Sequence, residues 1–274
     1  MDVYNAFLQG DLTEEVYMCP PQGFLSQGEK SHFDYSLFTK KQGTRLVIIL
    51  VYVDDLLITG NNQALISEAK TMLQGNFRIK DLGELKFFLG IELARSKEGI
   101  LMNQRKFTIE LITNLGLAGS KPVTTPMECN QRFTTMEYDQ HLNLKEDEKL
   151  VDSGPYQRLV GKLLYLTMTR PDICYAVHVL SQFMYCPKKS HMEATIRVVR
   201  YIKGAPGLRL LISSKQSSKL TAFCDADWAS CPVSRRSVTG YVMKLENSLV
   251  SWKSKKQGTI SRSSAEAEYR SMAA

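Results

Sequence analysis

The sequence has no hydrophobic run long enough to cross a membrane, and it lacks the cysteine patterns of metal-stabilised or secreted domains. Its longest apolar stretch, residues 46–53, is followed at once by two aspartates, which excludes a transmembrane helix. Its six cysteines show no paired spacing of the kind that builds a zinc site, and no secretory leader precedes them. Repeats and low-complexity tracts are also absent. We therefore expect reduced thiols in an intracellular protein without a membrane partner, in the cytoplasm or the nucleus.

The composition is that of a globular protein with an uneven charge. Of its residues, 43% are hydrophobic and 23% charged, as in ordinary globular proteins. Its length of 274 residues allows one large domain or two smaller ones. Residues 186–274 hold 16 Lys or Arg against 6 Asp or Glu, whereas residues 1–185 hold 19 against 22. A basic region fits a polyanion such as nucleic acid, although basic surfaces also occur on proteins that bind none.

Hydrophobic periodicity predicts an α+β chain. Strands are expected at residues 46–53, 56–59, 86–93, 99–103, 220–224, 240–245 and 249–253. Helices are expected at 63–75, 106–115, 155–169, 171–185 and 190–203, and from Ser263 onward, where Ser263 and Glu266 would form a capping box. Arg197, Arg200 and Lys203 fall off the apolar stripe of their helix, which favours a solvated face, with phosphate contact as the alternative.

Asp54 and Asp55 stand together between two apolar, β-prone runs. A buried carboxylate without a partner is costly, and a divalent cation removes that cost. A hairpin with both carboxylates at its tip therefore indicates a two-metal phosphoryl-transfer site. A solvated hairpin turn explains the local pattern about equally well.

Eight blocks, in one order along the chain, resemble the Pol polyprotein of copia-type LTR retrotransposons. They are MDVYNAFLQGDL at 1–12, YVDD at 52–55, DLGELKFFLGIEL at 81–93, TRPDICYAV at 169–177, CDADWA at 224–229, RRSVTGY at 235–241, SWKSKKQ at 251–257 and SSAEAEYR at 263–270. The resemblance implies a reverse transcriptase followed by ribonuclease H (RNase H). The expected divisions are a partial reverse transcriptase palm at 1–120, a linker or long loop at 121–154, a helical thumb or connection region at 155–210 and the N-terminal part of an RNase H-like domain at 211–274.

The resemblance also assigns roles in a polymerase site. Asp2 and Asp54 would bind two Mg²⁺ ions, with Asp55 beside them, and Asp2 would approach from a strand next to the hairpin. Tyr52 and Val53 would lie under the primer end and the incoming nucleotide. The implied partners are an RNA template, a DNA primer, an RNA–DNA hybrid and deoxynucleoside triphosphates.

In the RNase H segment, the resemblance makes Asp225 and Glu268 metal-binding carboxylates. Glu266 lies two residues from Glu268 and so points to another helix face, which favours a role in the cap. Asp227 is expected to be structural rather than a ligand. Three lysines could grip the phosphates of a hybrid or simply be solvated: Lys253, Lys255 and Lys256.

Three departures from the family pattern predict a truncated, internally deleted and inactive polymerase fragment. The chain begins one residue before Asp2, a segment normally found between Gly23 and Phe33 has no match, and the chain stops at Ala274 within the helix of Glu268. The alternative is a non-enzymatic protein, either a nucleic-acid-binding remnant or an inert relic. A third possibility is a gene-prediction error that removed coding sequence as an intron.

Overall fold

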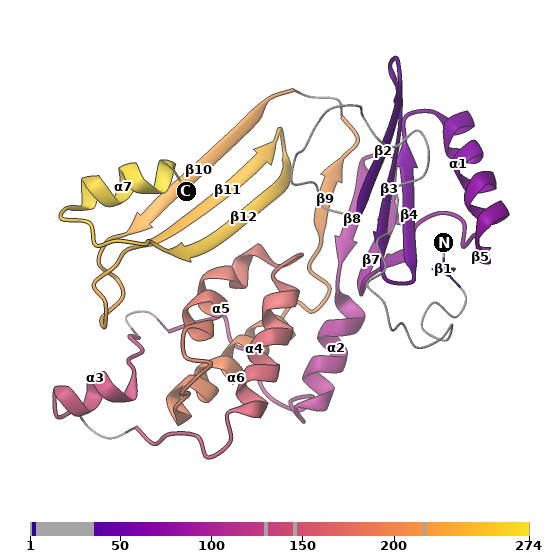
Figure 1. Cartoon of the computed structure of the whole chain (residues 1–274). Coiled ribbons are helices and arrows are strands. Elements are labelled where there is room, and N and C mark those ends of the chain that lie inside the picture. The colour runs from indigo at the N-terminus through magenta and orange to yellow at the C-terminus, as the bar shows by residue number, and fades with distance from the viewer. Residues whose placement is uncertain (1, 4–35, 129–130, 145–146, 216–217, 274) are drawn as a thin grey trace, which may run out of the picture. The chain divides into compact units, whose positions relative to one another are not determined.

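The computed structural model describes the backbone of residues 2–3 and, with side chains, residues 36–128, 131–144, 147–215 and 218–273. The chain divides into two compact units, an N-terminal unit of residues 1–88 and a C-terminal unit of residues 89–274 (Figure 1). The segment between Gly23 and Phe33, where the family pattern is interrupted, lies outside the described residues. Among the described residues, no helix has the length and apolar character needed to cross a membrane.

The N-terminal unit is an antiparallel sheet with one helix against it. Its five-stranded sheet has the order β2-β3-β4-β1-β5. The elements are β1 (Asp2–Val3), β2 (Leu37–Gln42), β3 (Arg45–Tyr52), β4 (Asp55–Gly60), α1 (Gln63–Asn76), β5 (Ile79–Lys80) and β6 (Phe87–Phe88).

One face of the β3–β4 hairpin forms the core of this unit. Alternation along β3 buries Val47 and Ile49 on the face that packs with α1, together with Leu56 of β4. Helix α1 contributes three residues spaced by four positions: Leu65, Ala69 and Leu73. The apolar face thus fixes the register of the hairpin and the position of its tip.

The C-terminal unit combines helices with two antiparallel sheets. Strand β8 pairs with β7 on one side and β9 on the other, and β10, β11 and β12 form a separate sheet in that order. The strands are β7 (Ile91–Arg95), β8 (Gly99–Asn103), β9 (Leu210–Ser213), β10 (Leu220–Asp227), β11 (Val238–Leu245) and β12 (Ser248–Lys256). The helices are α2 (Arg105–Asn114), α3 (Met136–His141), α4 (Gly154–Leu166), the 3₁₀ turn η1 (Pro171–Ile173), α5 (Cys174–Ser181), α6 (Lys189–Lys203) and α7 (Ser264–Met272).

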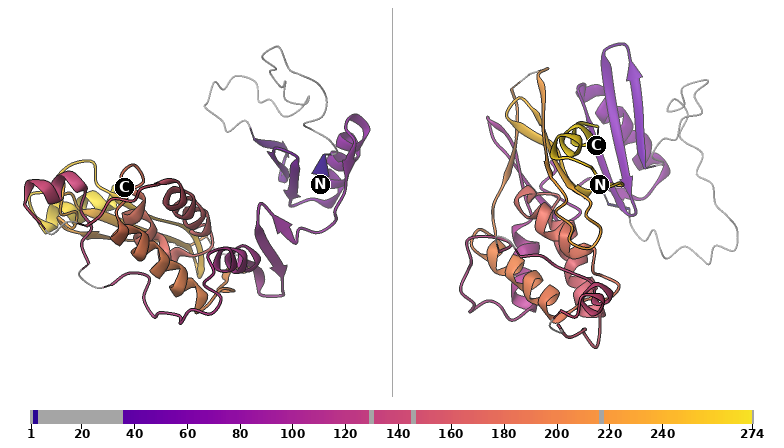
Figure 2. Two further views of the ribbon diagram at one scale, coloured as in Figure 1. Left: turned by 90° about the horizontal axis from the view of Figure 1, so that it is seen from below. Right: turned by 90° about the vertical axis from the view of Figure 1, so that its left-hand side faces the viewer.

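Helices α4, α5 and α6 pack together as the core of the C-terminal unit (Figure 2). Leu163 of α4, Val177 of α5 and Val198 of α6 are fully buried and belong to one apolar cluster. Tyr156 adds a polar link, because its hydroxyl donates to the carbonyl of Leu180 at 2.7 Å. These apolar stripes are the core-packing surfaces expected from the sequence.

The two faces of the β10–β11–β12 sheet meet different helices. On one face, the indole of Trp252 donates to the Thr167 carbonyl, after the end of α4, and the Lys256 backbone N–H donates to His178 of α5. On the other face, the Gln257 side chain that follows β12 donates both to Thr239 of β11 and to the carbonyl of Ala267 in α7. We call these the α5 face and the α7 face of the sheet.

The α+β class is confirmed, and most expected elements are present with ends shifted by a few residues. The region expected as one helix at 171–185 is a 3₁₀ turn followed by the shorter α5, and the expected strand at 86–93 is split into β6 and β7. The sequence reading missed β2 and β9, and the segment expected as a linker at 121–154 contains α3. The expected functional divisions stay predictions; the compact units differ from them, since the first ends at Phe88.

Candidate functional site

The β3–β4 hairpin ends in a tight, strained turn. Tyr52 and Asp55 are its last cross-strand pair, so Val53 and Asp54 form a two-residue loop. Val53 has φ of 50°, and a positive φ at the first loop position alone is the pattern of a type II′ turn, where glycine is usual. A β-branched residue in this conformation is strained. The turn leaves the side chains of Tyr52 and Val53 more than half exposed at the tip.

Asp54 has a buried carboxylate oxygen without a partner. Its Oδ1 atom is inaccessible to solvent and makes no hydrogen bond among the described residues. A buried acceptor left unpaired costs about 1–3 kcal/mol, and more when it is charged. A metal ion would satisfy such an oxygen, because hard divalent cations prefer carboxylate ligands. The donor chemistry of Asp54 therefore fits Mg²⁺.

The backbone brings Asp2 next to this turn. Strand β1 pairs antiparallel with β4, and Asp2 lies opposite Asp55 on one side and Lys80 of β5 on the other. The Asp2 side chain and residues 4–12 of the 1–12 block lie outside the described residues. A strand carrying Asp2 thus runs beside the hairpin as expected, and the joint metal binding of Asp2, Asp54 and Asp55 stays a prediction.

Asp225 lies on the α5 face of the C-terminal sheet. It is exposed on β10, opposite Gly240 of β11, which in turn lies opposite Ser254 of β12. It borders a cavity of about 410 Å³ lined also by Tyr175 of α5 and Trp252. The Ser254 hydroxyl is buried there and has no partner among the described residues.

Asp227 shares this face, two residues along the strand, and binds the helical core. Burial raises the pKa of the Tyr175 hydroxyl, and the nearby Asp227 carboxylate, which accepts a hydrogen bond from it, raises that pKa further. The bond links β10 to α5. The bond supports the structural role expected for Asp227, which stays a prediction.

Glu268 is carried by α7, which covers the other face of the sheet. The cap of α7 is formed as expected on one side, because Ser263 Oγ accepts from the Glu266 backbone N–H at 3.1 Å. The Glu266 carboxylate accepts from the Arg262 N–H, one residue before the cap, and from Arg270, so Glu266 is used at the helix start. Asp225 and Glu268 therefore sit on elements at different faces, and their pairing around a metal stays a prediction.

The described part of the chain contains no group of three or more His, Cys, Asp and Glu side chains arranged to hold a metal. At the hairpin, Asp2 is the expected further metal ligand, and its side chain is not described. At the C-terminal sheet it leaves Asp225 without a described set of co-ligands. The orphaned oxygen of Asp54 is thus the strongest local sign of a metal site.

The three lysines of β12 divide into two kinds. Lys253 and Lys255 are exposed and lie on the α7 face, and neither has a charged or hydrogen-bonding side-chain partner among the described residues. Lys256 lies on the α5 face and donates from Nζ to the Gln182 side chain at 2.6 Å. The structure thus separates two candidate phosphate contacts from one internal lysine.

The cations of α6 bind protein rather than solvent. Arg197 pairs with Glu128 at 3.0 Å, and Arg200 donates to the Lys121 carbonyl. Lys203 Nζ donates to three carbonyl oxygens, those of Leu117, Ala118 and Ser120. These bonds attach the segment after α2 to α6. The expected solvated face is therefore wrong for these three residues.

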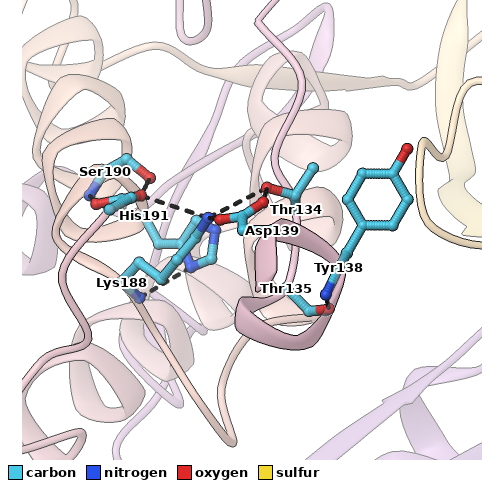
Figure 3. A network of polar contacts seen from close by, with 8 residues as sticks. Thr134, Thr135, Tyr138, Asp139, Lys188, Ser190 and His191 are labelled. Carbon is cyan, nitrogen blue, oxygen red and sulfur yellow. Dashed lines mark hydrogen bonds and ion pairs between the residues drawn. The ribbon is translucent and has the colours of Figure 1, made fainter. Parts of the chain in front are cut away.

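Sequence reasoning missed a buried charge network at the start of α6 (Figure 3). Lys188 is almost fully buried, and its Nζ donates to Asp139 of α3 at 2.5 Å and to Thr134 at 3.1 Å, with Asp147 at 3.5 Å. Asp147 also accepts from Ser190. The network fastens the expected linker to the helical core, and no local sequence pattern indicates it, because its charges lie about 50 positions apart.

His191 completes this network. Its Nδ1 accepts from the Lys188 backbone N–H at 3.1 Å, and its ring stacks on Phe183 with centroids 4.1 Å apart. Burial and then the Lys188 charge lower the pKa of His191 to about 4, so the ring is neutral near pH 7. Burial raises the pKa of the Asp139 carboxyl, and the bonds from Lys188 and Thr134 outweigh that effect and hold it below its usual value.

Comparison with known proteins gives three kinds of finding. Residues 25–129 match the family model described as reverse transcriptase (RNA-dependent DNA polymerase). Over the whole chain, the sequence is 38% and 37% identical to the retrovirus-related Pol polyproteins from transposons RE1 and RE2 of Arabidopsis thaliana. An uncharacterized mitochondrial protein of the same plant is 37% identical over 82% of this chain and 90% of its own length. No solved structure matches the chain.

The alignments also show how much of these relatives the chain represents. The chain spans about 20% of the length of the RE1 and RE2 polyproteins. Each alignment extends over 308 positions for a chain of 274 residues, so about 34 positions of each relative have no counterpart here. The chain is therefore collinear with one stretch of these polyproteins and interrupted within it.

Proposed function

Because the chain belongs to the family of copia-type retrotransposon Pol polyproteins, we propose that it derives from an RNA-directed DNA polymerase linked to RNase H. The N-terminal unit corresponds in this proposal to part of the polymerase palm, and the β10–β12 sheet with α7 to part of the RNase H domain. The buried, unpartnered oxygen of Asp54 at the hairpin tip carries the proposal. A purely structural turn gives no reason to bury a carboxylate oxygen unpaired.

In the polymerase reaction, Asp54 and Asp2 would hold Mg²⁺, and Asp55 would support them from the end of β4. Bound Mg²⁺ supplies an acidified primer hydroxyl and a clamp for the triphosphate and the leaving pyrophosphate. The chain's own contribution is position: the β1–β4 pairing sets Asp2 beside Asp55, and the strained turn fixes Asp54. Tyr52 and Val53, exposed at the tip, would contact the primer end and the incoming deoxynucleoside triphosphate.

The resemblance would make Asp225 and Glu268 Mg²⁺ ligands for hydrolysis of the RNA strand of an RNA–DNA hybrid. However, Asp225 lies on the α5 face of the sheet and Glu268 on the helix that covers the other face, so the described geometry does not bring the two carboxylates to one ion. Asp225 is exposed at the β10 side of the sheet, and α7 packs against β10 and β11. Asp227 would keep β10 attached to α5 through Tyr175. Its own replacement by Asn should therefore loosen the sheet rather than remove a metal ligand.

We propose further that the 274-residue chain does not extend a primer efficiently. The missing stretch of about 34 positions relative to RE1 and RE2 supports this, because polymerase catalysis depends on residues held in fixed mutual positions. The test is primer extension on an RNA template with Mg²⁺, comparing the chain with Asp54→Asn and with Glu84→Gln, an exposed control in the same unit. Extension that Asp54→Asn alone abolishes would contradict the proposed inactivity and support the metal role.

A second candidate function is binding of nucleic acid without turnover. Its support is the pair of exposed lysines Lys253 and Lys255, which lie on one face of an edge strand in the basic C-terminal third. Binding through phosphate contacts releases counterions and therefore weakens as salt rises.

The lysines of β12 supply a matched test of this second function. The affinity for an RNA–DNA hybrid is measured by fluorescence anisotropy at several salt concentrations. Lys253→Ala and Lys255→Ala should each reduce the logarithmic salt slope by about 1. Lys256→Ala should leave the slope unchanged, because that ammonium group bonds to Gln182. Equal slopes for all variants would show that the β12 lysines do not contact phosphate.

A further inference from the structure

Two acidic residues stand opposite one another beside the hairpin tip. Asp2 of β1 and Asp55 of β4 are direct partners in the antiparallel ladder. Like charges at such positions destabilise a sheet, because the Cα atoms of direct partners lie only about 4.5–5.5 Å apart. The pair therefore needs a positive charge, from a bound metal ion or from the chain itself. On its other side, β1 pairs with β5, and there Lys80 lies opposite Asp2.

Lys80 lies on the same face of the sheet as Asp55. Successive residues of a strand point to opposite faces. Leu56, the residue after Asp55, packs in the apolar cluster against α1. Ile79, the residue before Lys80, packs on the same cluster. The Asp55 and Lys80 side chains therefore lie on the face away from α1, and Asp2 occupies the register position between them.

The Lys80 ammonium group is not used elsewhere in the described part of the chain. The side chain is exposed, and it makes no ion pair or hydrogen bond with another described residue. Its nearest acidic neighbour in the sequence, Asp81, accepts instead from Lys70 of α1 at 2.8 Å. Adjacent strands lie about 4.8 Å apart, so Lys80 is one strand spacing from Asp2 and two from Asp55. The flexible four-carbon stem of lysine suits such a span.

We propose that Lys80 is the internal countercharge of the hairpin site. Without a metal ion, its ammonium group offsets the repulsion between the carboxylates of Asp2 and Asp55. When a divalent cation binds at the hairpin tip, the same ammonium group repels it and limits the affinity of the site for metal. This effect on affinity rests on the proposed function, in which Asp54 and Asp2 hold Mg²⁺.

The first arm of the test measures the affinity of the full chain for Mn²⁺ at low ionic strength, by electron paramagnetic resonance of the free ion. Lys80→Met should bind Mn²⁺ about tenfold more tightly, because it removes a unit charge roughly 8 Å from a divalent ion at a solvated surface. Lys80→Arg keeps the charge and should stay within about twofold of the unmodified chain. Lys41→Met is the matched control, because Lys41 lies on the same sheet face but opposite Leu46, at the other end of the hairpin.

Salt separates an effect of charge from an effect of packing. The tighter binding by Lys80→Met should nearly vanish at about 1 M KCl, where the Debye length falls to about 3 Å. A gain in affinity that salt leaves unchanged would show that the substitution acts through packing, and it would overturn the proposal.

The second arm needs no metal, so it can fail independently of the proposed function. In EDTA at low ionic strength, Lys80→Met should unfold about 2–4 °C below Lys41→Met, because the carboxylate pair loses its countercharge. Adding Asp55→Asn to Lys80→Met should recover this loss, since the repulsion between the two carboxylates is then removed as well.

The two arms together decide the proposal. Tighter Mn²⁺ binding and lower metal-free stability in Lys80→Met, without either change in Lys80→Arg, support it. Equal or weaker Mn²⁺ binding in Lys80→Met, when the unmodified chain does bind the ion, overturns the countercharge and leaves the metal role of Asp54 intact. If no form of the chain binds Mn²⁺, the proposed metal role fails. The metal-free arm then supports or overturns the pairing of Lys80 with the carboxylates by itself.

Discussion

Two carboxylates in different units of this chain are buried in opposite ways. Asp139, in the C-terminal unit, accepts bonds from the Lys188 ammonium and the Thr134 hydroxyl. Asp54, in the N-terminal unit, has one oxygen shielded from solvent with no partner among the described residues. Asp54 interrupts an apolar run at a hairpin turn, whereas Asp139 lies in the first turn of the short, polar helix α3. Their hydrogen-bond partners in the folded chain also differ.

The difference shows how a carboxylate with a binding function can be distinguished from one that only stabilises the fold. A carboxylate whose bonding capacity is used inside the protein needs nothing further, so Asp139 is explained by stability. A carboxylate with an unused buried oxygen stores an energetic cost that a ligand can remove, so Asp54 indicates a binding function. Carboxylate oxygens shielded from solvent occur at both kinds of place, and the count of hydrogen-bond partners distinguishes them.

The largest expected effect comes from breaking the ion pair between Lys188 and Asp139. Lys188→Met leaves the buried carboxylate of Asp139 without its positive partner and removes the nearby charge that faces the partly exposed Asp147. Breaking a buried ion pair in this way typically costs about 3–5 kcal/mol in the free energy of unfolding. Urea denaturation of the variant measures this loss. The matched control is Lys189→Met, because Lys189 pairs with Glu148 at the surface and such pairs add little stability. If both variants unfold at the same urea concentration, the network does not anchor the segment around α3.

The next effect is the acid sensitivity of the same network. The pKa of His191 is about 4 in the fold, below the 6.5 of an unfolded histidine, so the unfolded chain takes up a proton first as the pH falls. Stability from this group is therefore complete above pH 6.5 and is lost between pH 6.5 and about 4. Between pH 7 and 4.5 the loss should be about 2–3 kcal/mol, measured as the pH dependence of the free energy of unfolding.

His191→Asn is the control for this dependence. Asn retains an acceptor for the Lys188 N–H and does not titrate, so the slope between pH 7 and 4.5 should flatten. His178, whose pKa is lowered by burial and by Lys256 and Lys253, contributes to the slope that remains. An unchanged slope in His191→Asn would assign the acid sensitivity elsewhere.

Sequence periodicity was sufficient for elements with a buried face. The β3–β4 hairpin, α1 and α6 each carry apolar residues at strand or helix spacing, and the structure places them within one or two residues of the expected bounds. It was insufficient for β2, whose residues are mostly exposed, and for α3, which is short and polar. These elements form because of partners elsewhere in the chain, and periodicity contains no information about such partners.

The candidate sites show the same limit. The pairing of YVDD residues in a hairpin followed from the pattern around Asp54, but the orphaned oxygen depends on atoms from the folded unit. The cations of α6 were read as exposed from their place on a helical wheel. They are instead used by carbonyl and carboxylate groups of residues 117–128, which lie about 70–85 positions earlier. A helical wheel cannot include contacts of that range.

The unpaired oxygen of Asp54 predicts that a substitution at this residue raises the free energy of unfolding. In buffer with EDTA, Asp54→Asn should raise the free energy of unfolding by about 1–2 kcal/mol, because it removes the negative charge from a side chain with one buried, unpaired oxygen. Addition of Mg²⁺ or Mn²⁺ should stabilise the unmodified chain and Glu84→Gln but not Asp54→Asn. A ligand that binds only the native state raises the free energy of unfolding. Thermal denaturation with and without metal measures both effects. A loss of stability in EDTA would mean that Asp54 is satisfied after all, and the contrast with Asp139 would disappear.

The smallest expected effect concerns the turn that holds Asp54 in place. Val53→Gly relieves a β-branched residue at φ of 50°, and the gain is partly offset by the greater freedom of glycine in the unfolded chain. The net increase in unfolding free energy should be about 0.5–1 kcal/mol in EDTA. If the strain positions Asp54, the same variant should bind Mn²⁺ more weakly despite its higher stability. If Val53→Gly gains stability and Mn²⁺ stabilises it as much as it stabilises the unmodified chain, valine at this position strains the turn without contributing to metal binding.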